Sequence, residues 1–216
     1  MRNLEGYNIY HLGISGGKDS TAVAQLVYYM LLGLRPEESM SRHVVLVNRA
    51  PVLTLWASVV AERLGYDHEA ALSLGKALAG LNAQSKGRRL GIYKPPEIVE
   101  GLPPKRARRG EEFWVQLLGR PIPAIQTGRG VRAVEGDRPI EPSGVERYLY
   151  SKFGEAFDSV RRAMEELARA FSPSELAARA FSLYEHFRPS IPEGVRGWGA
   201  KGELDLDRIR GLSDKV

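Results

Sequence analysis

Two serines, two glycines and an aspartate lie within six residues near the start of the chain. Residues 15–20 read Ser-Gly-Gly-Lys-Asp-Ser. Gly16 and Gly17 can adopt backbone angles that are closed to other residues, so the chain can turn sharply and direct its N–H groups at a bound anion. The hydroxyl groups of Ser15 and Ser20 can donate further hydrogen bonds. The segment is therefore suited to binding phosphate.

The sequence predicts a strand before this loop and a helix after it. Residues 9–14 have the apolar character of a strand, and Thr21 opens a predicted helix over residues 22–32. The positive end of that helix would face an anion held by the loop. The spacing is not the G-x-x-x-x-G-K-[ST] of a Walker loop, which disfavours a P-loop NTPase. The alternative is an ordinary strand-to-helix turn that contains two glycines.

The run Ser-Gly-Gly-Lys-Asp-Ser resembles the SGGxDS signature of the PP-loop ATP pyrophosphatase family. That family includes adenylyl-sulfate reductases, tRNA-thiolating enzymes and amidating synthetases. The resemblance covers only the N-terminal part of the chain. It implies that ATP and Mg2+ are the cofactors, that a substrate oxygen attacks the α-phosphate, and that pyrophosphate is lost from an adenylylated intermediate. In the reductase branch the same loop binds an already activated sulfonucleotide.

The resemblance also implies a role for each residue of the loop. Asp19 would hold Mg2+, and Lys18 would add positive charge nearby, so these two are the candidate catalytic residues. Hydroxyl groups and backbone N–H groups would bind the phosphates. The predicted nucleotide-binding residues are Ser15, Gly16, Gly17, Asp19, Ser20, Thr21 and Asn48.

Asn48 belongs to this set because the resemblance implies that a second strand, which it ends, would end near the adenosine. Residues 43–48 form a continuous run rich in valine, of the kind found in strands buried on both faces of a parallel sheet. Residues 7–48 thus read as one strand-helix-strand unit, in which residues 9–14 pair with this run. The predicted fold class is α/β: a partial PP-loop (HUP-like) unit, followed by a mainly helical region with a small β-hairpin.

Three regions are predicted along the chain. Residues 1–95 form an α/β region with a possible junction near Met40, residues 96–142 a basic loop and hairpin, and residues 143–216 a helical region. The first region also contains predicted helices over 53–64 and 69–81, the second capped by Asp67. The helix pair reads either as a helix-turn-helix or as a packed helical hairpin.

The later regions carry their own local signals. Residues 113–118 and 121–126 read as a hairpin whose prolines confine the second arm to a sheet edge, and residues 131–134 add a short strand. Ser143 with Glu146 forms a capping-box pattern at a helix start, with Gly154 as a break further on. Ser172 caps another predicted helix, which begins with proline.

Basic residues favour a second functional interpretation, that of a non-enzymatic nucleic-acid-associated protein whose PP-loop element is a degenerate or chimeric scaffold. The chain carries a net charge of +5, which favours polyanionic partners. Solvated loops are the alternative. The candidate phosphate contacts are Lys86, Arg88, Arg89, Lys105, Arg106, Arg108 and Arg109.

Composition excludes several kinds of chemistry. The chain has no cysteine, which excludes disulfides, thiolate metal sites and cysteine-dependent sulfur transfer within it. No segment has the pattern of a signal peptide or of a membrane span. We therefore expect a cytoplasmic protein without a membrane partner, whose ligand is an adenine nucleotide or a nucleic acid.

Overall fold

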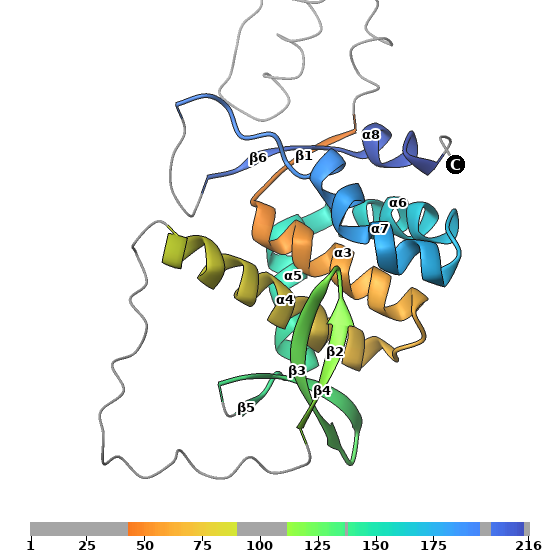
Figure 1. Ribbon diagram of the computed structural model, residues 1–216. Helices are drawn as coiled ribbons and strands as arrows, with labels where there is room; N and C mark the ends of the chain where they lie inside the picture. The colour runs from red at the N-terminus through yellow and green to blue at the C-terminus, as the bar shows by residue number, and fades with distance from the viewer. Residues whose placement is uncertain (1–42, 90–111, 137, 195–199, 214–216) are drawn as a thin grey trace, which may run out of the picture. The chain divides into compact units, whose positions relative to one another are not determined.

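The computed structural model describes residues 43–89, 112–136, 138–194 and 200–213 (Figure 1). The chain divides into two units between His43 and Val44, and the elements below belong to the second. The described part is a mixed α/β fold with much helix and small antiparallel sheets. In chain order its elements are β1 (Val44–Val47), α3 (Arg49–Arg63), α4 (His68–Arg89), β2 (Glu112–Leu117), β3 (Arg120–Thr127), β4 (Gly130–Glu135), β5 (Arg138–Pro139), α5 (Pro142–Phe153), the 3-10 helix η1 (Gly154–Ala156), α6 (Phe157–Arg169), α7 (Pro173–Phe187), β6 (Gly202–Asp205) and α8 (Leu206–Arg210).

Helices α3 and α4 pack against each other as a helical hairpin. The turn contains Gly65, whose φ of 100° is readily adopted only by glycine. The carboxylate of Asp67 accepts a hydrogen bond from the N–H of Ala70 at 2.9 Å, which confirms the predicted cap. Helix α3 is buried without interruption from Pro51 to Ala61. Of the two interpretations given for this helix pair, the structure therefore agrees with the packed helical hairpin.

Helix α4 is longer than the sequence pattern predicted. The expected end at Leu81 is wrong, because the helix continues to Arg89. Residues 82–89 contain alanine, glutamine, lysine and arginine, which favour helix even where no apolar face remains to be buried. Helical propensity, and not amphipathic periodicity, sets this end of α4.

Strands β2, β3, β4 and β5 form an antiparallel sheet in that order, which confirms the predicted hairpin and third strand. The second arm of the predicted hairpin is β3, and the prediction that it is an edge strand is wrong. Strand β3 lies between β2 and β4. Its pairing with β4, however, begins only at Ala124. Pro121 and Pro123 lie before that point and pair only with β2, so their missing N–H groups remove no bond to β4.

The buried hydroxyl group of Ser73 joins α4 to this sheet. It donates to the carbonyl of Ala70 at 2.8 Å and accepts the N–H of Ala133, in β4, at 3.0 Å. The carbonyl of Ala133 in turn accepts the N–H of Ile140 at 2.9 Å, just before α5. One turn of α4, the end of β4 and the start of α5 are therefore held together.

Helices α5 and α6 share one apolar stripe, interrupted at Gly154 as predicted. Gly154 has a φ of 54°, and the chain passes through the 3-10 helix η1 before α6 begins. The predicted capping box of Ser143 and Glu146 is wrong. Helix α5 begins at Pro142, whose fixed φ suits a first helical position, and no side chain caps it.

A capping box does form at the start of α7, as the sequence predicted for Ser172. The Ser172 hydroxyl accepts the N–H of Glu175 at 3.4 Å, and the Glu175 carboxylate accepts the N–H of Ser172 at 3.0 Å. The Ser172 hydroxyl also donates to the Glu175 carboxylate at 2.6 Å, and this bond, together with that from the Ser172 N–H, holds the pKa of the Glu175 carboxyl below its usual range.

Ser172→Ala should lower the free energy of unfolding by about 1 kcal/mol, because it removes this cap. Ser143→Ala is the matched control: Ser143 is exposed and lies inside the first turn of α5, so its effect should stay within about 0.5 kcal/mol. Urea denaturation followed by circular dichroism measures both. An equal cost for the two variants would contradict this assignment of the caps.

Strand β1 pairs with β6 in antiparallel fashion, Val44 opposite Asp205 and Val47 opposite Gly202. The prediction of a parallel strand buried on both faces is therefore wrong for β1 as described. Val44 and Leu46 are 37% and 63% exposed, while Val47 is buried. A half-exposed strand usually shows alternating polar and apolar residues. This strand has valine or leucine on both faces, so its sequence does not reveal which face is exposed. The predicted partner segment, residues 9–14, lies outside the described residues.

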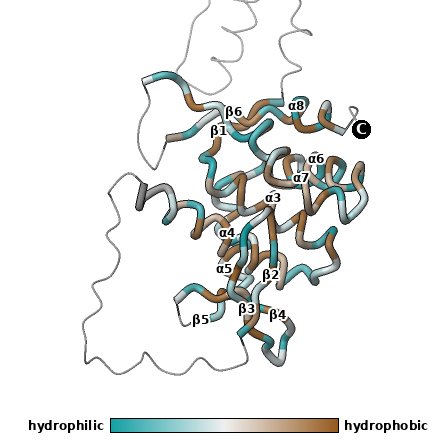
Figure 2. The backbone as a smooth tube through the Cα atoms, in the orientation of Figure 1, coloured by the Kyte–Doolittle hydropathy of each residue, from teal (hydrophilic) through white to brown (hydrophobic). Residues whose placement is uncertain are grey.

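A single hydrophobic core connects the two sheets and the helices. Hydrophobic positions recur along the helices and along β2 to β4 (Figure 2). The predicted apolar stripes of α5, α6 and α7 are buried in this core. Their buried members include Val145, Leu149, Phe153, Phe157, Val160, Met164, Leu167, Leu176, Ala180, Leu183 and Phe187.

Candidate functional site

Most of the residues that the sequence singled out lie outside the described part of the chain. They comprise the whole predicted phosphate-binding loop with the residue after it, and the basic residues between positions 105 and 109. These residues are Ser15, Gly16, Gly17, Lys18, Asp19, Ser20, Thr21, Lys105, Arg106, Arg108 and Arg109.

Asn48 is described, and its side chain is engaged in holding the C-terminal segment. The Asn48 amide donates to the carbonyl of Ala200 at 3.3 Å, and the neighbouring Arg49 Nε donates to the carbonyl of Pro189 at 3.0 Å. The Tyr184 hydroxyl donates to the Arg49 carbonyl at 3.3 Å, and burial raises the pKa of Tyr184 to about 12. These contacts give Asn48 and Arg49 a structural role at the junction of β1 and α3.

The first basic cluster lies on the C-terminal end of α4. Lys86, Arg88 and Arg89 are all within the helix. Cations at this end of a helix interact favourably with its dipole, which is a structural reason for their presence.

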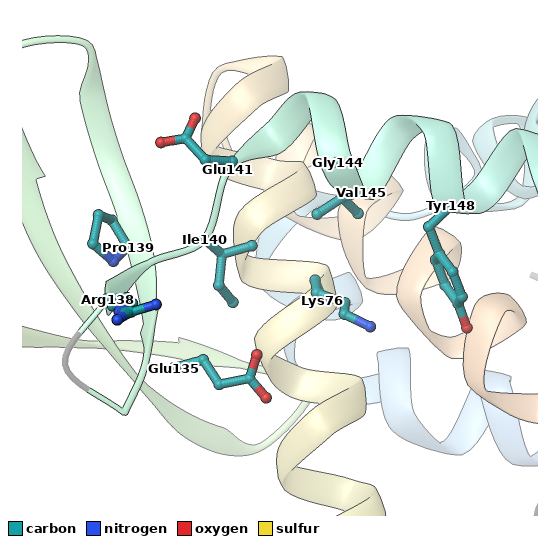
Figure 3. Close-up of a pocket in the computed structure, with 9 residues that line it drawn as sticks. All are labelled: Lys76, Glu135, Arg138, Pro139, Ile140, Glu141, Gly144, Val145 and Tyr148. Carbon is teal, nitrogen blue, oxygen red and sulfur yellow. The ribbon is translucent and has the colours of Figure 1, made fainter.

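A pocket of about 400 Å3 opens where α4, the end of the β4–β5 hairpin and the start of α5 meet (Figure 3). The Ser73 and Ile140 hydrogen bonds described above fix these three elements. The residues that line the pocket are Lys76, Glu135, Arg138, Pro139, Ile140, Glu141, Gly144, Val145 and Tyr148. A volume of this size lies within the range of pockets that bind small molecules.

An aromatic ring positions the ammonium group of Lys76 in this pocket. Lys76 Nζ lies 4.5 Å from the centroid of the Tyr148 ring, and Lys152 Nζ lies 5.8 Å from it. Lys152 does not line the pocket. Burial raises the pKa of Tyr148 above its ordinary value, which itself lies well above neutral. The protonated hydroxyl can both donate and accept a hydrogen bond.

Two basic residues of the pocket differ from the buried Arg132 and the half-buried Arg161, which are paired with carboxylates. In the part of the chain that the structure describes, neither Lys76 nor Arg138 forms an ion pair, although Glu135 and Glu141 line the same pocket. By contrast, Arg161 of α6 binds both carboxylate oxygens of Glu62 in α3, the shorter bond being 2.7 Å.

The even more deeply buried Arg132, in β4, is also paired. Its guanidinium group binds the carboxylate of Glu69 at the start of α4. Arg132 and Arg161 therefore each carry a carboxylate partner, whereas Arg49 and Arg63 contact other elements through backbone carbonyl groups.

No group of side chains suited to holding a metal ion occurs among the described residues. The acidic residues near the C-terminus include Asp205, whose carboxylate accepts the N–H groups of Asp207 at 2.9 Å and Arg208 at 3.2 Å and so caps α8. Its position is explained by helix capping.

Comparison with known proteins returns no match to this chain among protein families, curated proteins or solved structures. None of the described helices is both long enough and apolar enough to cross a bilayer. Functional assignment therefore rests on the chain's own residues. The sequence did not single out the pocket residues, which are spread over three elements without a recognisable spacing.

Proposed function

We propose that the chain binds an adenine nucleotide with Mg2+ through residues 15–20 and transfers the adenylyl group to a substrate, releasing pyrophosphate. The complete six-residue match to the SGGxDS signature carries this proposal. An ordinary strand-to-helix turn requires glycine only at its bend. It does not require two hydroxyl groups and a carboxylate at fixed places around the two glycines.

The residue types of the loop suit each part of this chemistry. The N–H groups of Gly16 and Gly17 and the hydroxyls of Ser15 and Ser20 bind phosphate oxygens. The carboxylate of Asp19 supplies an oxygen ligand for Mg2+. Lys18, the neighbour of Asp19, would help to offset the charge that develops on the departing pyrophosphate, and Mg2+ held by Asp19 would supply further positive charge there. Asn48 is not part of this proposal, because its amide group holds Ala200.

Isothermal titration calorimetry with ATP and Mg2+ tests the proposal. Asp19→Ala should weaken ATP binding by about tenfold or more, because a charged metal-linked interaction is worth about 1.5–3 kcal/mol. Glu155→Ala, at an exposed carboxylate of η1, is the control and should bind like the wild type. A parallel titration with adenylyl sulfate distinguishes the sulfonucleotide ligand from ATP. No heat with either nucleotide, or equal affinity in all three proteins, would contradict the proposal.

Nucleic-acid binding remains the second candidate function. One observation favours it: α4 continues through Lys86, Arg88 and Arg89, so three of the predicted phosphate contacts share one helix end. Neutralising phosphates releases counterions, so such binding would weaken steeply with salt. Salt-dependent binding of an oligonucleotide that is unchanged by Asp19→Ala would favour this function over the first.

A further inference from the structure

We propose that the pocket between α4, the β4–β5 hairpin and α5 binds a free amino acid, or a zwitterion of similar size with an apolar substituent. This inference does not rest on the function proposed for residues 15–20. The proposal rests on two cations and two carboxylates, an aromatic hydroxyl and an apolar wall gathered around one cavity of about 400 Å3.

The charges of the pocket come from separate elements and leave its interior open. Lys76 extends from α4, and the carboxylate of Glu135 projects from the end of β4 toward the same space (Figure 3). They nonetheless form no ion pair, as shown above. Arg138 lies across the hairpin turn from Glu135, and Glu141 stands where α5 begins.

The apolar part of the pocket lies between these charged groups. Ile140 projects into the space between the hairpin and α4, and Val145 faces it from α5 (Figure 3). Val145 is buried and Ile140 half-buried, so both are fixed by the core. An aliphatic substituent of a ligand would bury apolar surface mainly against Ile140, because Val145 is only 3% exposed.

The balance of charge favours a zwitterion over a simple ion. A free anion attracted by Lys76 and Arg138 would also meet the carboxylates of Glu135 and Glu141, and a free cation would meet the two basic groups. A ligand that carries a carboxylate and an ammonium group at neighbouring positions satisfies both pairs. A nucleotide triphosphate, with several negative charges, is disfavoured by the same carboxylates.

The Tyr148 ring strengthens this assignment. It holds the Lys76 ammonium by a cation–π contact but does not neutralise it, so the positive charge remains available to a ligand carboxylate. The protonated Tyr148 hydroxyl can donate to the same carboxylate. Lys76 and Tyr148 thus mark the carboxylate end of the site, and Glu135 the ammonium end.

Calorimetry of the full chain with a panel of the proteinogenic amino acids tests the site. At about 10 mM ligand even a millimolar Kd is detected. We expect at least one aliphatic amino acid to bind. Lys76→Met, which keeps the chain length and removes the charge, should weaken that binding by about tenfold or more, as should Glu135→Gln. Lys152→Met is the matched control, because Lys152 contacts the same ring from outside the pocket.

Analogues that lack one charge complete the experiment. With leucine as the example, 4-methylpentanoic acid lacks the ammonium group and 3-methylbutylamine lacks the carboxylate, and each should bind at least about tenfold more weakly. Three results would overturn the proposal: no binding by any amino acid, equal binding by an analogue that lacks one charge, or equal binding by wild type and Lys76→Met. Circular dichroism melting confirms that the variants are folded.

Discussion

Trp56→Ala should lower the free energy of unfolding by about 4 kcal/mol, close to the whole stability of a marginal domain. Trp56 lies in α3 and is fully buried. Its indole N–H donates to the carbonyl of Ala180 in α7 at 2.8 Å, and its ring meets Phe187 edge to face at 5.3 Å between centroids. The substitution leaves a cavity and removes contacts between α3 and α7.

Chemical denaturation measures this loss, and a second substitution separates its causes. Trp56→Phe keeps an aromatic ring but removes the N–H group, so we expect a loss of about 1–2 kcal/mol. The same change at Trp114 is the control. Trp114 is 64% exposed on β2, and its replacement should cost less than about 0.5 kcal/mol. Similar costs at the two positions would refute the central place of Trp56 in the core.

Gly75→Ala should destabilise the fold by about 2–3 kcal/mol, although alanine favours helix. A Cβ atom at Gly75 would lie 2.3 Å from the Ser58 hydroxyl oxygen and 2.5 Å from the Thr54 carbonyl oxygen. The second contact is with backbone, so rotation of a side chain cannot relieve it. Helices α3 and α4 would have to move apart and disturb the buried face of α3.

Gly80→Ala, in the same helix, should have the opposite effect. A Cβ atom there would meet only the Glu135 carboxylate, at an ordinary 3.6 Å. The better helix propensity of alanine should then raise stability by about 0.5–1 kcal/mol. Thermal melting of both variants measures these two changes in stability. Two changes of the same sign would contradict the close approach of α3 and α4 at Gly75.

These two glycines illustrate how far the sequence could predict the fold. Two glycines within a helix suggest close packing at both, and the structure confirms a close backbone approach at Gly75 only. Sequence cannot distinguish them, because the difference depends on which turn of α4 faces α3. Local signals were more informative. Asp67, Gly154 and Ser172 were placed correctly, because caps and breaks depend on a few neighbouring residues.

Pairing between distant segments was harder to predict. The run Val44–Val47 was recognised as a strand, but β6 as its antiparallel partner was not, since nothing in residues 202–205 encodes that partnership locally. The pocket was missed for the same reason. Lys76, Glu135 and Tyr148 belong to different elements, which are brought together by core packing and by tertiary hydrogen bonds such as that from Ala133 to Ser73.

The pairing of β1 with β6 has a consequence for synthesis of the protein. Residues 44–47 emerge from the ribosome long before residues 202–205, and the contact between Asn48 and Ala200 likewise spans 152 residues. A nascent chain that ends before Gly202 therefore lacks this partner for β1 and leaves an apolar strand edge free to pair with other chains. This sheet can therefore close only after residues 202–205 have left the ribosome, and chaperone protection is most valuable during that interval.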